Sequence, residues 1–160
     1  MIIAHAPAGY LLYRVFPPSW QTRSILITTL IGAIAPDFDF AFNILGLSDL
    51  NHRFFLTHTP IFWIVLFGFT ILTARLLKQN TRVIQAFFYA TFLHIALDIP
   101  TGIRVWYPFS ETVVNWFPKV YSTRLTAAEH LMHPYVIAEF VIWGIAIGLF
   151  VQRHLKKNQS

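Results

Sequence analysis

The chain has 160 residues, of which 56% are hydrophobic, 17% aromatic and only 12% charged. Soluble domains carry about 25% charged residues, so the composition argues against a water-soluble globular protein. The net charge of +5 comes without a basic run set in polar surface, which argues against a nucleic-acid partner and favours a role in membrane orientation. The absence of cysteine excludes disulfides and thiolate metal ligands. We expect one membrane-embedded domain over residues 1–160.

Apolar segments follow one another along the whole chain. The first residues lack the charged start and cleavage pattern of a signal peptide, so we expect them in the mature protein. The pattern predicts five apolar segments, at 2–16, 24–35, 54–74, 83–97 and 132–151. A membrane helix needs about 20 residues, so 83–97 is short for a span alone but plausible within a helical bundle. Pro36 is expected to end or kink the second segment, and residues 38–47 to continue it at a new angle. Region 99–130, rich in Pro, Trp and Tyr, is predicted to be a non-helical interfacial cap.

Basic residues predict the orientation of these segments. If the segments alternate in direction, 8 of the 12 Lys and Arg fall on one side, which is then expected to be cytoplasmic. These eight are Arg14, Arg23, Arg75, Lys78, Arg82, Arg153, Lys156 and Lys157. The N-terminus is then outside and the C-terminus inside. All seven acids, and every histidine except His154, fall at or toward the opposite face, although none of them was used to assign it.

Two pairs of residues at that opposite face have the types and spacing of metal ligands. His94 and Asp98 are four residues apart, so they share one face of a helix. Ionisable groups within or beside membrane helices are costly, and they suggest function by default. Asp37 and Asp39 lie in "APDFDF", where alternate residues of an extended backbone point the same way. The sequence therefore predicts that carboxylates and an imidazole converge.

Two further histidines extend this set. His5 is expected one turn into the first helix, and His58 is expected to open the third. Histidine and aspartate without thiolate suit Zn²⁺, Mn²⁺ or Fe²⁺, with one or two ions and Zn²⁺ the first expectation. The candidate residues in these stretches also have simpler interpretations taken one at a time. His52 suits an interfacial or hydrogen-bonded histidine, and Asp37 suits a turn carboxylate.

Two further features each have two interpretations. "EHLMH", with Glu129, His130 and His133, suits either additional ligands or an ordinary helix N-terminus. Glu139 suits either a supporting partner of a ligand or an ion pair with Arg104.

Four stretches together resemble the family of predicted membrane-bound metal-dependent hydrolases, which includes an SOS-regulated bacterial inner-membrane protein. They are "HAPAGYLL", "GAIAPDFD", "HRFFLTHTP" and "HIALDIPTGIRVWYPF", and the resemblance runs from His5 to about Phe109. It implies metal ligation by five residues with two near neighbours, Asp39 and His52. The implied ligands are His5, Asp37, His58, His94 and Asp98. "HRFFLTH" is bulkier than the family's usual second motif, which leaves open whether His52 or His58 binds the metal. The ligand set is also similar, more distantly, to zinc-dependent phospholipase C sites.

We therefore expect an all-α integral membrane protein of about five helices in a prokaryotic inner membrane, with a divalent metal site toward the non-cytoplasmic face. The expected function is hydrolysis of a phosphoester in a lipid or lipid-linked substrate, with a metal-activated water as the nucleophile. Membrane lipids are the expected partners. Asp39 or His52 would act as general base, and Arg53 would hold the anion through its planar fork. The alternatives are a non-catalytic metal-binding or structural membrane protein and a metal or proton transporter.

Overall fold

The computed structural model describes residues 3–47, 51–117 and 131–157. Within these ranges, five α-helices of eleven or more residues account for most of the chain: α1 (His5–Val15), α2 (Arg23–Ile34), α4 (Pro60–Leu76), α5 (Arg82–Asp98) and α8 (Pro134–Lys157). Short 3₁₀ turns and the five-residue α3 (Phe40–Ile44) connect them. The only β-type pairing among the described residues is one isolated bridge, Ile103 to Val114. The predicted all-α class is confirmed.

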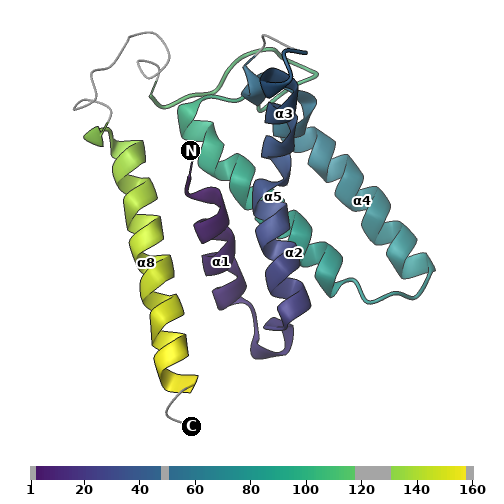
Figure 1. Cartoon of the computed structure of the whole chain (residues 1–160). Helices are drawn as coiled ribbons and strands as arrows, with labels where there is room; N and C mark the ends of the chain where they lie inside the picture. Colours follow the sequence, from purple (N-terminus) through teal and green to yellow (C-terminus); the bar gives the residue numbers. More distant parts are fainter. Residues whose placement is uncertain (1–2, 48–50, 118–130, 158–160) are drawn as a thin grey trace.

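The long helices alternate in direction, so successive connections lie at opposite ends of the bundle (Figure 1). Helix α5 packs against α2, α1 packs against both, and α8 packs against α1. One end of the bundle therefore gathers the start of α1, the end of α2, the turns before α4 and the end of α5 (Figure 1). We call it the upper end, and the opposite one the lower end.

Helices α2 and α5 approach each other closely at Gly32. A Cβ atom placed there would lie 2.3 Å from the Phe87 carbonyl oxygen, so only glycine permits this contact without a backbone shift. The Thr91 hydroxyl uses the proximity and donates to the Gly32 carbonyl at 3.1 Å. This donation satisfies a carbonyl in the last turn of α2, where intrahelical partners run out.

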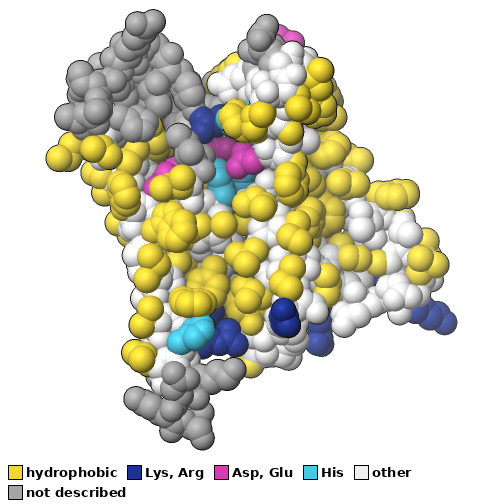
Figure 2. Space-filling view, viewed as in Figure 1, with side chains coloured by type: hydrophobic (Ala, Val, Ile, Leu, Met, Phe, Trp, Pro, Cys, Tyr) yellow, Lys and Arg dark blue, Asp and Glu magenta, His cyan; other side chains and the backbone are white. Residues whose placement is uncertain are grey.

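The exterior of the bundle, like its core, carries many large hydrophobic side chains. Buried clusters form around Trp63, Phe88 and Ile95 and around Tyr13 and Ile25. Large hydrophobic side chains also cover the outside of the helices (Figure 2), as lipid contact requires. Among the described residues, three helical stretches are long and apolar enough to cross a membrane: Arg23–Ile44, Arg82–Thr101 and Pro134–Leu155.

The structure corrects three local predictions. The segment expected at 54–74 becomes a helix only at Pro60, because two 3₁₀ turns, His52–Phe54 and Leu56–His58, come first. The backbone at Asp37 and Asp39 is a 3₁₀ turn, Ala35–Asp39, and is not extended. It still interrupts the second segment at Pro36, as predicted. His5 is the first residue of α1 instead of lying a turn inside it.

Candidate metal centre

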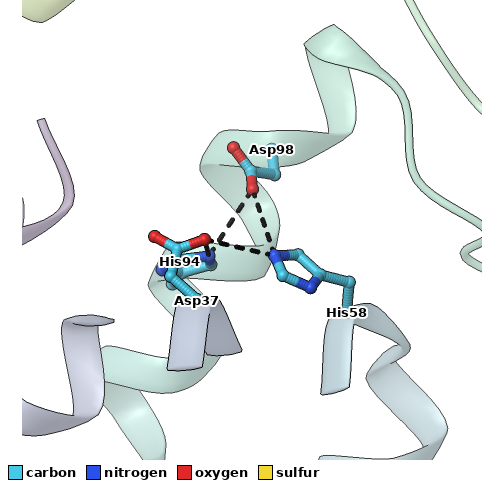
Figure 3. Close-up of side chains that lie close together, drawn as sticks. All are labelled: Asp37, His58, His94 and Asp98. Atoms are coloured by element: carbon cyan, nitrogen blue, oxygen red, sulfur yellow. Dashed lines mark ion pairs between the residues drawn. The ribbon is translucent and has the colours of Figure 1, made fainter. Parts of the chain in front are cut away.

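Four side chains at the upper end point into one space (Figure 3). His94 and Asp98 come from α5, Asp37 from the turn after α2, and His58 from the turn before α4. One nitrogen or oxygen of each lies within 4.8 Å of the corresponding atoms of the others. His58, His94 and Asp98 are buried, whereas the side chain of Asp37 is 35% exposed. We call these four residues the cluster.

His94 is held by its inner ring nitrogen. Its Nδ1 lies 2.7 Å from the carbonyl oxygen of Ala33, and a carbonyl can only accept, so Nδ1 carries the proton. Nε2 is the ring nitrogen that faces the cluster, 3.5 Å from Asp37 Oδ1 and 3.5 Å from Asp98 Oδ2. A backbone carbonyl that orients an imidazole in this way is typical of metal-binding histidines.

His58 is held in the same way by a carboxylate. Its Nδ1 lies 3.0 Å from Asp39 Oδ2, and the Thr57 hydroxyl donates to that same oxygen. The Trp63 indole of α4 donates to the Thr57 carbonyl at 2.6 Å, which fixes the turn against the helix that follows it. The Nε2 atom of His58 faces the cluster, 3.4 Å from Asp37 Oδ1 and 3.8 Å from Asp98 Oδ2.

These separations fit a divalent ion. Bonds of about 2.0–2.2 Å in a tetrahedral site place neighbouring ligand atoms about 3.3–3.6 Å apart, and four cluster distances lie between 3.4 and 3.8 Å. The Nε2 atoms of His58 and His94 are buried without a hydrogen-bond partner among the described residues. A metal ion between these two atoms would give each nitrogen a partner. Two imidazoles and two carboxylates suit Zn²⁺, Mn²⁺ or Fe²⁺.

The carboxylates also set the charge of His58. Burial alone would lower its pKa, but the nearby carboxylates of Asp37, at 3.4 Å, and Asp39, at 3.0 Å, outweigh burial and raise the pKa to about 9. The metal-free imidazole is therefore protonated at neutral pH. The pKa of His52 moves in the opposite direction, because burial and then the positive charges of His58 and Arg53 disfavour its protonated form.

His5 borders the cluster from α1. Its ring stacks on that of His94, with centroids 3.7 Å apart and planes at 15°. Its Nε2 lies 3.4 Å from Asp98 Oδ1 and its Nδ1 lies 3.5 Å from Asp37 Oδ2, so it contacts the carboxylate oxygens that face away from His58. Glu139 of α8 accepts a hydrogen bond from the Ile3 backbone N–H at 3.3 Å, which ties the start of α1 to α8.

The three residues expected to act in catalysis occupy different positions. His52 lies at the rim, with Nε2 3.9 Å from Asp37 Oδ1 and its side chain 25% exposed. Arg53 is buried, with Nε 3.9 Å from Asp98 Oδ2. Asp39 is buried behind His58 and does not face the cluster.

The remaining sequence candidates do not belong to the cluster as far as the described residues show. His133 lies outside the cluster, and its ring packs against Phe117 and Tyr135; Glu129 and His130 lie outside the described residues. Sequence reasoning missed Thr57 and the Ala33 carbonyl. The only signal for Thr57 in the sequence is its position beside His58. A backbone carbonyl such as that of Ala33 has no signal in the sequence.

The sequence model of the YdjM inner membrane protein family matches residues 1–158. The chain belongs to this family. The match extends well beyond Phe109, where the resemblance in the sequence motifs ends. No curated protein and no solved structure matches the chain.

The family description and the structure agree on the class of protein. An inner membrane protein family and three helical stretches suited to crossing a bilayer together indicate an inner membrane protein. The family description names a location and no reaction, so the chemistry of the chain has to be argued from the cluster.

Proposed function

We propose that the chain is a membrane-bound metal-dependent hydrolase that acts on a phosphoester of a lipid or lipid-linked substrate. One observation carries this proposal. His58 and His94 are each anchored through Nδ1, and both present Nε2 to a space bounded by two carboxylates, one of them partly exposed. The exposed edge at Asp37 gives a bound ion a side from which a substrate can approach.

The chemistry divides between the ion and the protein. A divalent ion held by the cluster supplies Lewis acidity and lowers the pKa of a coordinated water. Asp39 and the Ala33 carbonyl keep the two imidazoles in the ligating tautomer. Arg53, beside Asp98, is proposed to hold an anionic substrate oxygen through two parallel donors.

His52 is the better candidate for general base. Asp39 Oδ2 already accepts hydrogen bonds from His58 and Thr57. His52 is partly exposed beside Asp37, and its lowered pKa keeps it neutral near pH 7. A neutral imidazole at the rim of the cluster can accept a proton from water and release it to solvent.

The surroundings of the cluster favour a lipid substrate. Phe38, Phe40 and Phe42, beside Asp37 and Asp39 in the chain, are 64%, 48% and 50% exposed. Three exposed aromatic side chains so close together offer an apolar surface that acyl or prenyl chains can contact. Because Lys and Arg gather mainly at the lower end (Figure 2), we propose that the cluster faces the non-cytoplasmic side.

A structural metal centre is the second candidate. Four protein ligands from three elements are enough to fill a tetrahedral ion, as in structural zinc sites. Such a centre would tie α5 to the ends of α2 and α4 without a reaction.

Metal content and turnover, measured on the same purified variants, separate the two candidates. The substrates are phospholipids and polyprenyl phosphates. For a hydrolase, His58→Ala loses metal and activity, whereas Arg53→Ala keeps the metal and loses turnover. Arg53→Lys restores little, because a compact ammonium cannot form two parallel bonds to phosphate. The exposed His154→Ala, at the opposite end of the bundle, is the control for metal content. Wild-type protein that holds metal but turns over none of these substrates supports a structural centre, and equal metal loss in the Arg53 and His58 variants rejects the role given to Arg53.

A further inference from the structure

The lower end of the bundle holds a basic cavity, far from the metal centre. Its volume is about 570 Å³, within the roughly 300–1,000 Å³ of small-molecule sites. It lies at the end of α1, the start of α2 and the last turns of α8. Its polar lining comes from Tyr10, Tyr13, Gln21, Arg23, Arg153 and His154.

The positive charge of this cavity is not neutralised from within. The eight described residues that line it include two arginines and no carboxylate. Arg153 lies beside the Tyr13 hydroxyl, and the nearby Arg14 donates to the Tyr10 hydroxyl at 3.3 Å. Both of these neighbours are neutral phenols, which do not cancel the positive charge of a guanidinium group.

An apolar groove adjoins the cavity between α1 and α8. Its volume is about 300 Å³, and its lining includes Pro7, Leu30, Trp143 and Ile147. The cavity and the groove share Tyr10 and Phe150, whose rings meet edge to face at 6.1 Å. The groove extends from this shared wall toward Pro7, near the upper end of α1.

Because the basic cavity and the apolar groove adjoin at this shared wall, we propose that the lower end binds an anionic phospholipid, with its phosphate in the cavity and one acyl chain in the groove. A free phosphate would use the cavity alone, and a zwitterionic lipid would gain less from two unneutralised arginines. Trp143, Ile147 and Phe150 are 39%, 52% and 51% exposed on the outside of the bundle, so a chain can enter from the bilayer. Basic pockets between membrane helices are known to bind anionic head groups.

The proposal does not depend on the metal centre or on hydrolysis, because none of its residues belongs to the cluster. It predicts a lipid that is retained in the purified protein and is not a substrate. The same site would hold the lower ends of α1, α2 and α8 together.

Native mass spectrometry of the full-length protein tests the head-group site. Phosphatidylglycerol is compared with phosphatidylcholine, and we expect phosphatidylglycerol to bind more tightly by about tenfold, the effect of one charge-assisted hydrogen bond. The double variant Arg23→Gln with Arg153→Gln should remove this preference, while Arg23→Lys with Arg153→Lys should keep most of it. The matched control changes Arg75 and Arg82 to Gln, because both are at the same end but do not line the cavity.

The groove is tested separately. Ile147→Trp should fill it and weaken phosphatidylglycerol binding, whereas Ile145→Trp, on the same helix with similar exposure and outside the groove lining, should not. Inorganic phosphate should bind weakly and equally to both variants. Equal binding of the two lipids, an equal loss in the control variants, or phosphate binding as tight as that of the lipid would each overturn the proposal. Metal content should stay unchanged throughout, which keeps this result distinct from a failure of the hydrolase proposal.

Discussion

The close contact at Gly32 gives a sharp test of how the metal centre is built. Gly32→Ala would place a Cβ 2.3 Å from the Phe87 carbonyl oxygen and 3.0 Å from its carbon. Ordinary van der Waals contacts are about 3.5 Å long, so the backbones of α2 and α5 must separate by roughly 1 Å. Both atoms belong to the backbone of α5, so a side-chain rotation cannot relieve the clash.

This separation acts directly on the cluster. Asp37 follows α2, whereas His94 and Asp98 belong to α5, and the Ala33 carbonyl that anchors His94 moves with α2. Metal sites tolerate deviations of about 0.2 Å in ligand distance. A shift several times larger should weaken metal binding by roughly 10–100-fold and cost about 1–3 kcal/mol of stability through overpacking.

The assay is metal affinity by competition with a chelator, together with thermal unfolding in the same detergent. Gly68→Ala is the matched control, because a Cβ at that helical glycine meets nothing within 4 Å. We expect Gly68→Ala to behave as wild type. If Gly32→Ala also binds metal and unfolds as wild type, the α2–α5 contact does not set the ligand geometry, and the reasoning is refuted.

Three further predictions concern the support, the protonation and the orientation of the site. Asp39→Asn should lower metal affinity roughly 10–100-fold, because His58 loses a charged partner; the exposed Glu111→Gln is the control, and equal affinities would contradict the role of Asp39. Since the pKa of His58 is raised to about 9 in the metal-free protein, metal binding must displace a proton at any lower pH. Affinity should then rise about tenfold per pH unit toward pH 9, and calorimetry in buffers of different ionisation enthalpy should detect proton release; a flat profile would contradict this. A cysteine at the exposed Thr112 should react with an impermeant reagent on intact cells and one at the exposed Asn80 should not; the reverse would overturn the orientation.

The sequence predicts best what depends on helix periodicity. His94 and Asp98 share a helix face at i and i+4 wherever α5 packs, and the structure shows their facing atoms 3.5 Å apart. The distribution of Lys and Arg along the chain predicts which helix ends lie on the same side of the membrane. This prediction needs no information about contacts between helices. Pro36 limits the second segment because its ring cannot continue a helix.

The sequence predicts poorly what depends on turns and on backbone groups. Two 3₁₀ turns precede α4, and Thr57 and His58 in the second turn pair with Asp39, 18 and 19 residues earlier in the chain. No local sequence pattern indicates that pairing. The same turns bury His58 and leave His52 at the rim, a difference that the sequence alone does not show.

The account depends most directly on whether the cluster holds a divalent ion. The decisive measurement is elemental analysis of purified protein after exposure to Zn²⁺, Mn²⁺ and Fe²⁺ and removal of the excess, for wild type, Asp98→Asn and the control His154→Ala. We predict roughly one tightly held ion per chain in wild type and in the control, and its loss in Asp98→Asn, because a neutral amide then replaces one of the two carboxylates of the cluster. A wild-type chain that retains no ion, or an Asp98→Asn variant that retains as much as wild type, would contradict the account.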